Sequence, residues 1–135
     1  MYLVRVGSGS WGDVVTLAVA EGKCAVLDFL MGLDRSQDAS VGKMMYMLTQ
    51  RVPSLGPPKH NKEQSRHIED KIFEFKADQL RVLYFYDKGR VVVCAHGFSK
   101  QSDKTPGKEI KRAKDLRKIY LAAKKCAEVH IVDMD

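Results

Sequence analysis

Lysine and arginine side chains, which bind phosphate, are concentrated in the second half of the sequence. The chain has 135 residues and a formal net charge of +6 at pH 7. Residues 1–70 contain 8 basic and 8 acidic side chains, whereas residues 71–135 contain 15 and 9. Between Lys88 and Lys125 there are 12 basic and 3 acidic side chains, a local charge of +9. This asymmetry favours a polyanionic partner, nucleic acid first and an acidic membrane surface second. The alternative is a basic helix that is simply exposed to solvent.

The cysteines and histidines are not spaced as metal ligands. The three cysteines are far apart, form no C-x-x-C pair, and two of them lie in strongly apolar contexts: Cys24, Cys94 and Cys126. The four histidines show no ligand spacing either: His60, His67, His96 and His130. An odd number of scattered cysteines argues against a disulfide framework and for a reducing compartment. The sequence therefore predicts no metal, no cofactor and a cytoplasmic location.

Length and composition predict one soluble globular domain, residues 1–135. A hydrophobic fraction of 44% and a charged fraction of 30% exclude a disordered chain, and this length suffices for one core. Ala18-Val19-Ala20 resembles a signal-cleavage site, but the apolar run before it is short and follows Asp13. We therefore expect a strand there, with no export signal, no membrane span and no membrane partner.

The first half of the chain has two strand patterns followed by two helix patterns. Residues 2–6 and 14–20 are rich in β-branched residues and predict strands that can form a hairpin. Residues 24–33 place apolar side chains at helical spacing and predict a helix. A second helix is predicted from Ser40, as N-cap, to Arg51, with Pro53 ending it. Residues 59–69 are polar and predict a surface loop.

The second half predicts three strands and a basic helix. Residues 72–76, 80–86 and 90–98 fit a three-stranded antiparallel meander, with Phe73 and Phe75 facing the core. Residues 91–95 are apolar on both faces, which is typical of a central strand covered on both sides. Thr105 and Pro106 are predicted as the N-cap and first residue of the last helix. The predicted fold class is therefore α/β (α+β): N-terminal strands, two helices, the meander and a basic C-terminal helix.

Four short motifs follow one another in the second half of the chain. They are Ile72-Phe73-Glu74-Phe75-Lys76, Leu80-Arg81-Val82-Leu83-Tyr84-Phe85, His96-Gly97-Phe98-Ser99-Lys100, and Lys104-Thr105-Pro106 followed by Glu109-Ile110. Together they resemble the RelE/ParE toxin superfamily, specifically its HigB-like, phage-derived branch. In that branch the corresponding stretches read roughly L-W-E-L-R, R-V-L-Y, H-G-F-x-K-K and K-T-P-x-x-E-I. The resemblance covers about residues 71–125, and Ala25–Leu33 is similar to the family's first helix. It implies a RelE-like fold, with residues 1–12 and 126–135 as peripheral extensions.

The resemblance also implies an activity. It is that of a toxin of a type II toxin–antitoxin system, an endoribonuclease (mRNA interferase) that cleaves mRNA, usually on the ribosome. A ribose 2′-OH attacks the adjacent phosphate, which requires a base, cations for the added phosphate charge, and an acid for the leaving oxygen. The implied partners are mRNA, the ribosome and a cognate helix-turn-helix antitoxin.

Carried onto this sequence, the resemblance assigns catalytic roles to three cations. Arg81 matches the family's sheet arginine, and its guanidinium could grip two phosphate oxygens in the transition state. The alternative is an ion pair of Arg81 with Glu74 or Asp87. Lys100 is expected to serve as a cation, or as a base if nearby cations lower its pKa. Lys76 is the third candidate, on the strand face of Ile72 and Glu74.

The remaining candidates are weighed against packing. His96 has a pKa range suited to acid–base work, but it is expected to share a strand face with Val92, Cys94 and Phe98, which favours a packed histidine. Tyr84 and Tyr86 are expected to pack in the core rather than stack on bases. Four cations are expected to contact RNA phosphates: Lys104, Lys108, Lys111 and Arg112.

Two other functions remain open. One is a gyrase poison of the ParE branch, which shares the fold but not the RNA chemistry. The other is a non-catalytic nucleic-acid-binding domain, because Phe73, Lys76 and Gln101 stand where the family usually has Trp, Arg and a second Lys.

Overall fold

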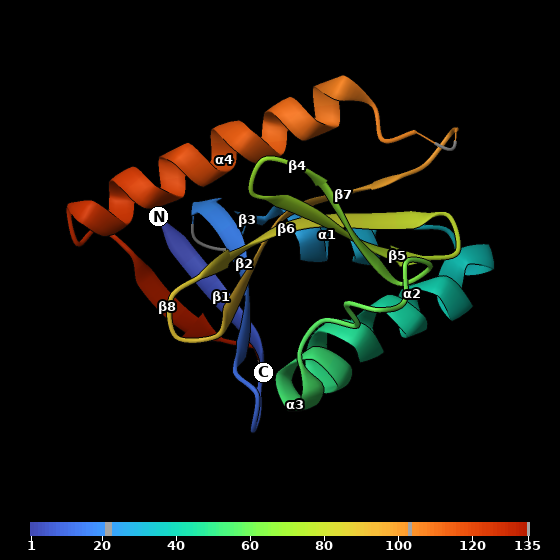
Figure 1. Cartoon of the computed structure of the whole chain (residues 1–135), viewed down its shortest axis with the longest axis horizontal. Helices are drawn as coiled ribbons and strands as arrows, with labels where there is room; N and C mark the ends of the chain where they lie inside the picture. The colour runs from blue at the N-terminus through green and yellow to red at the C-terminus, as the bar shows by residue number, and fades with distance from the viewer. Residues whose placement is uncertain (21–22, 103, 135) are drawn as a thin grey trace.

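The computed structural model, which describes residues 1–20, 23–102 and 104–134, is a mixed sheet with helices on both faces (Figure 1). The strands are β1 (Tyr2–Ser8), β2 (Asp13–Ala20), β3 (Lys23–Cys24), β4 (Ser65–Glu69), β5 (Ile72–Ala77), β6 (Leu80–Asp87), β7 (Val91–Ser99) and β8 (His130–Asp133). The helices are α1 (Ala25–Met31), α2 (Asp38–Tyr46), α3 (Val52–Leu55) and α4 (Gly107–Lys125), with a 3₁₀ turn η1 (Arg35–Gln37) and a π-helical turn η2 (Met47–Arg51). The expected RelE-like α/β (α+β) fold class is confirmed.

The sheet joins the two ends of the chain through parallel pairings. Its order is β4-β5-β6-β7-β2-β1-β8, with β3 paired to β2. The strands β4 to β7 form an antiparallel meander, and β1 and β2 form the expected hairpin. Parallel pairings then connect β2 to β7 and β8 to β1. The segments outside the family resemblance, 1–12 and 126–135, thus contribute β1 and β8.

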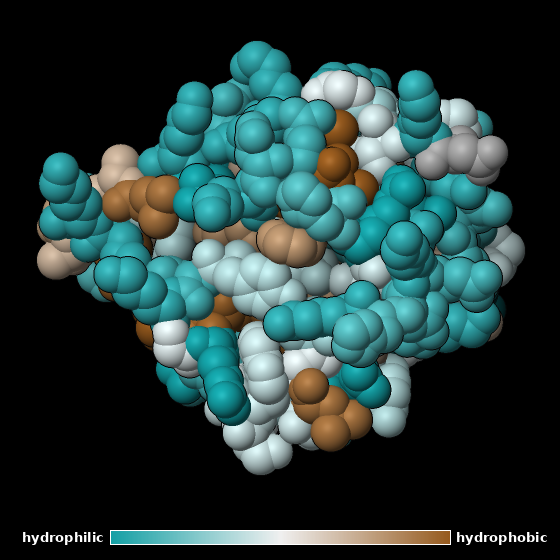
Figure 2. All heavy atoms as spheres, viewed as in Figure 1, coloured by the Kyte–Doolittle hydropathy of each residue, from teal (hydrophilic) through white to brown (hydrophobic). Residues whose placement is uncertain are grey.

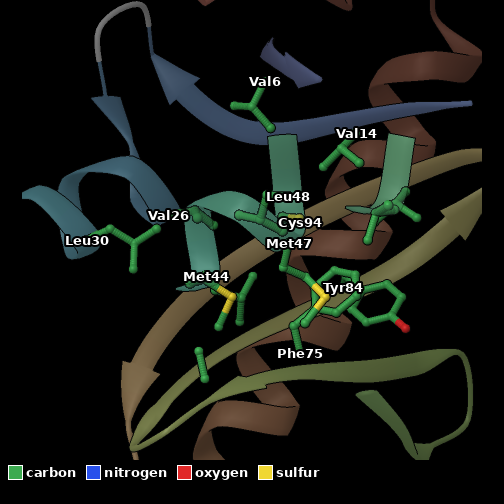
Figure 3. Packing of buried hydrophobic residues seen from close by; sticks show 14 of the residues in the cluster. Val6, Val14, Val26, Leu30, Met44, Met47, Leu48, Phe75, Tyr84 and Cys94 are labelled. Atoms are coloured by element: carbon green, nitrogen blue, oxygen red, sulfur yellow. The ribbon is translucent and has the colours of Figure 1, made fainter. Parts of the chain in front are cut away.

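Two cores lie on the two faces of the sheet. On the face covered by α1, α2, η2 and α3, Met44, Met47 and Leu48 pack against Phe75 and Tyr84 (Figure 3). On the other face, which we call the α4 face, the smaller core includes Leu83, Phe85 and Val93 of the sheet with Ala113 and Tyr120 of α4. The central position of residues 91–95 is confirmed, because Val92 and Val93 are fully buried, one in each core.

The second helical segment differs from its prediction at both ends. It begins at Asp38, and Ser40 is not the N-cap but donates its hydroxyl to Asp78 Oδ2 at 2.6 Å. Pro53 does not end it, because the π-helical turn η2 ends at Arg51 and the proline is the second residue of α3, which follows directly. Proline has no N–H for the usual helical hydrogen bond, and a widened turn accommodates that loss. The helix ends at Leu55, where Gly56 takes a φ of 82° that favours glycine.

Two further predictions of local structure were wrong. Residues 59–69 are not all loop, since β4 pairs with β5 and extends the meander to four strands. Thr105 is not the N-cap of α4, because that position belongs to Pro106 and the Thr105 hydroxyl donates to Glu74 Oε2 at 2.6 Å. Within the described residues, no helix has the length and apolar character needed to cross a membrane.

Candidate functional site

Cations from four segments meet on the α4 face of the meander. In the strand ladders Arg66 lies opposite Glu74, and Lys76 lies opposite Arg81. Cross-strand partners share a face, so all four side chains belong to the α4 face. The backbone N–H of Lys100 donates to the Gln79 carbonyl at 2.8 Å, which holds the residue after β7 beside the start of β6. We call Arg66, Lys76, Arg81 and Lys100 the cationic cluster.

Glu74 is the carboxylate around which this cluster is built. Its side chain is fully buried, and Oε1 accepts from Arg66 Nε at 3.1 Å and lies 3.6 Å from Arg81 Nε. Oε2 accepts the Thr105 hydroxyl, which ties the segment before α4 to the sheet. A buried charge is tolerated only when it is paired and hydrogen-bonded. Because the buried Glu74 carboxylate requires charged and hydrogen-bonding partners, it holds both guanidinium groups in place.

Arg81 is held more tightly than Arg66. The side chain of Arg81 is buried, and its Nη1 donates to the carbonyl oxygens of Asp78 at 2.7 Å and Leu80 at 2.8 Å. The sequence left open an ion pair with Glu74 or Asp87, and the structure has the one with Glu74. Asp87 instead accepts from Lys124 Nζ at 2.6 Å and from the Tyr120 hydroxyl. Arg66, with 34% of its side chain exposed, is the arginine of the cluster that solvent reaches more easily.

Lys76 is the lysine whose ionisation the cluster changes. Burial lowers the pKa of Lys76, and the charges of Arg66, Arg81 and Lys100 lower it further, against the opposing effect of Glu74. A lysine with a lowered pKa has a larger neutral fraction, which is the form that accepts a proton. From the sequence, Lys100 was the lysine expected to be able to act as a base.

His96 does not lie on the strand face that alternation predicts. Leu83 pairs with His96 but Tyr84 pairs with Cys94, so Ala95 is an extra residue in β7. Such a bulge reverses the side-chain alternation beyond it. Val92 and Cys94 pack in the core opposite α4. His96 instead points to the α4 face, where its ring lies beside Phe98.

The ring of His96 is buried under the first turns of α4. Nε2 donates to the Glu109 carbonyl at 3.0 Å, and Nδ1 is buried with no hydrogen-bond partner among the described residues. Burial lowers the pKa of His96 and keeps the ring neutral. The predicted packed histidine is confirmed, on the other face. Its proposed catalytic role stays a prediction, as do those of Arg81, Lys76 and Lys100.

The expected packing of the tyrosines is confirmed for Tyr84. Its ring stacks on Phe75 with centroids 3.9 Å apart, and its hydroxyl points out of the core (Figure 3). The hydroxyl lies 2.6 Å from Ser65 Oγ, and burial raises the pKa of Tyr84. Tyr86 is partly buried and also packs against this core, with its ring edge-on to Phe73 at 5.0 Å.

The four cations expected to contact RNA are exposed at the N-terminal end of α4 and just before it: Lys104, Lys108, Lys111 and Arg112. Lys111 Nζ also pairs with Asp115 at 2.8 Å, but both side chains remain largely exposed. Hydrophilic residues cover α4 and most of this side of the molecule, and apolar residues form only separate patches (Figure 2). This surface can attract polyanions without presenting a large apolar contact area.

Sequence reasoning missed Arg66, Glu74 and Thr105 as site residues. Arg66 lay in the presumed loop, Glu74 was considered only as a partner of Arg81, and Thr105 was assigned to capping. A signal for Arg66 was present, because a strand over 65–69 would place Arg66 opposite the acidic residue of the next strand. No group of three or more His, Cys, Asp or Glu within the described ranges could hold a metal ion.

Comparison with known proteins identifies the family. No curated protein matches the chain significantly. A family model described as phage-derived protein Gp49-like (DUF891) matches residues 28–118, from within α1 to most of the way along α4. That match covers more than half of the chain and includes every residue of the cationic cluster. The chain therefore belongs to the phage-derived Gp49-like family, which is part of the RelE/HigB-like toxin group.

Proposed function

We propose that this protein is the toxin of a type II toxin–antitoxin pair and acts as an endoribonuclease on ribosome-bound mRNA. The observation that carries the proposal is the convergence of Arg66, Lys76 and Arg81 around one buried carboxylate. Cations in excess over acids stabilise the negative charge that develops when a 2′-OH attacks a phosphate. The family membership supports the same function.

Each residue of the cationic cluster has a proposed role. Lys76 takes the proton of the attacking 2′-OH, because its lowered pKa makes the neutral amine more available. The more exposed Arg66 contacts the phosphate oxygens, and Arg81 adds positive charge from its buried position. Lys100 is the cation that protonates the leaving 5′-oxygen. Glu74 is a positioning residue, since a fully buried carboxylate cannot meet the substrate.

The proposed partners follow from the surface around the cluster. The exposed cations at the N-terminal end of α4 contact phosphates of the message or of ribosomal RNA. We also propose that a helix-turn-helix antitoxin binds this protein in the cytoplasm and neutralises it.

The test is incubation of the purified protein with translating ribosomes and a defined message. Primer extension maps the cuts, and a 2′,3′-cyclic phosphate at the new 3′ end identifies attack by the 2′-OH. Arg66→Ala and Lys76→Met should each lower the cleavage rate on the order of 10² to 10³-fold. Lys71→Ala is the matched control, because Lys71 is exposed at the other end of β5. Intact message with damaged gyrase–DNA complexes would instead identify a gyrase poison, and intact message with RNA binding alone a non-catalytic domain.

A further inference from the structure

A cavity lies beside the cationic cluster. It has a volume of about 950 Å³ and lies between the helical segment α2–η2–α3 and the stretch that connects this segment to the meander. Three carboxamides line it, Gln50, Asn61 and Gln64, together with Arg51 and the ring of Tyr46. A second cavity of about 500 Å³ shares Arg51, Asn61 and Gln64 with the first and lengthens it into a groove.

The π-helical turn η2 helps to form this groove. Met47, Gln50 and Arg51 all belong to the turn, and all three line the cavity. A π-turn is rare and occurs frequently at functional sites. Pro53 has no N–H for the usual helical hydrogen bond, and a widened turn accommodates that loss.

The groove begins at the cationic cluster. Lys76 belongs to the cluster and also lines the groove. The N–H of Lys76 donates to the Gln64 carbonyl at 2.9 Å, so a residue of the groove wall is hydrogen-bonded to a residue of the cluster. Because the cluster lies on the α4 face and the groove on the side of α2, a ligand that occupies both must pass around the edge of the sheet at Gln64 and Lys76, beyond the last β4–β5 pair.

We propose that the groove binds the single-stranded RNA segment next to the phosphate held by the cationic cluster, an inference that rests on the proposed function for the nature of the ligand. Carboxamide side chains can both donate to and accept from the edges of unpaired bases. Tyr46 is 64% exposed, and such a ring offers a base a surface to stack on. Arg51 supplies a cation for the RNA backbone.

The charges of the groove fit RNA better than an acidic peptide or a basic one. Of the two acids that line it, Asp78 accepts from Ser40 Oγ at 2.6 Å and from Lys43 Nζ at 3.1 Å, which leaves Glu63 as the acid without a described ion pair. Lys59 and His60 line the continuation of the groove. The lining thus combines cations, amides and an aromatic ring. These are groups that proteins use to bind single-stranded nucleic acid.

Binding of 2′-O-methyl RNA, which cannot be cleaved by 2′-OH attack, tests the groove separately from catalysis. Fluorescence anisotropy measures the affinity for a dinucleotide and for progressively longer oligonucleotides. Wild-type affinity should rise with length, and Tyr46→Ala and Gln50→Ala should remove about tenfold from the affinity of the long oligonucleotides while sparing the dinucleotide. Lys71→Ala, at an exposed position outside both the groove and the cationic cluster, is the matched control and should not change the gain with length.

The outcomes separate this inference from the proposed nuclease. If Tyr46→Ala and Gln50→Ala bind every length as the wild type does, the groove is not an RNA site, whether or not the protein cleaves mRNA. If they lose the gain with length while the wild type leaves mRNA intact on ribosomes, the groove stands and the nuclease proposal falls. If wild-type affinity does not rise with length, the groove proposal also falls, and the cavity is then open to a protein partner.

Discussion

Glu74 stabilises the cationic cluster from a position that solvent does not reach. Replacing it by glutamine keeps the volume but leaves the buried Arg81 without a counter-charge. Removing one partner of a buried ion pair destabilises a protein by about 3–5 kcal/mol. We expect Glu74→Gln to lower the free energy of unfolding by this amount, measured by urea denaturation.

The control for this prediction is Glu69→Gln in the neighbouring strand. Glu69 is exposed and pairs with Lys114 at the surface, where an ion pair contributes about 0–1 kcal/mol. A loss for Glu74→Gln no larger than that for Glu69→Gln would show that Glu74 does not hold the cluster together.

Lys76 gives the proposed cleavage a defined dependence on pH. The base must be neutral to accept the 2′-OH proton, so the cleavage rate should rise with pH until Lys76 is fully deprotonated. Because the pKa of Lys76 is lowered, this rise should level off below the pH at which an ordinary lysine titrates. Single-turnover cleavage between neutral and alkaline pH measures the profile. Lys76→Arg, which stays protonated, should lose the rising limb, and an unchanged profile in that variant would exclude Lys76 as the base.

At the scale of the elements, strong periodic patterns were readable from the sequence and local exceptions were not. The hairpin β1–β2, the central strand β7 and the basic helix α4 were predicted because apolar spacing is set by burial. β4 was missed because it is an edge strand with mostly polar residues, where burial leaves little pattern. The bulge at Ala95 has no signature in the sequence, and it moved His96 to the α4 face. The ion-pair partner of Arg81 could be narrowed only to Glu74 or Asp87, because the choice depends on Tyr120 and Lys124 of α4, which take Asp87 in the structure.

Gly97 sets how closely α1 packs on β7. A Cβ at this position would lie 2.6 Å from Phe29 Cδ2 and 3.2 Å from the Arg81 carbonyl oxygen. We expect Gly97→Ala to destabilise the protein by about 1–3 kcal/mol, because overpacking forces the helix away from the sheet. Thermal denaturation measures the change.

Gly42 provides the matched comparison, since it lies within α2 and a Cβ there meets nothing within 4 Å. Alanine favours a helix over glycine by about 1 kcal/mol, so Gly42→Ala should raise the melting temperature. A Gly97→Ala protein that melts at or above the wild-type temperature would mean that α1 can shift without cost.

At the scale of the whole molecule, the charge is distributed unevenly over the chain. The local +9 of residues 88–125 lies largely on α4 and before it, where many of the side chains are exposed. RNA affinity should therefore fall steeply as salt rises, because phosphate binding by cations releases counterions. Anisotropy titrations at several salt concentrations give the slope, and Lys108→Ala with Arg112→Ala should make it shallower. A flat salt response would assign the basic helix to a protein partner instead of RNA.

The parallel pairings of β2 with β7 and of β1 with β8 also determine when the molecule can form during synthesis. Asp13 pairs with Val91, and Tyr2 pairs with His130. Translation proceeds from the N-terminus, so the hairpin β1–β2 emerges long before either of its parallel partners. Contacts this distant in sequence make folding slow. The cationic cluster, by contrast, comes from the short stretch between Arg66 and Lys100. Its last strand, β7, nevertheless has β2 as its other neighbour in the sheet. A growing chain therefore carries an incomplete sheet until β7 has left the ribosome, so that, under the function proposed above, the nascent protein could not yet act on the ribosome that is making it.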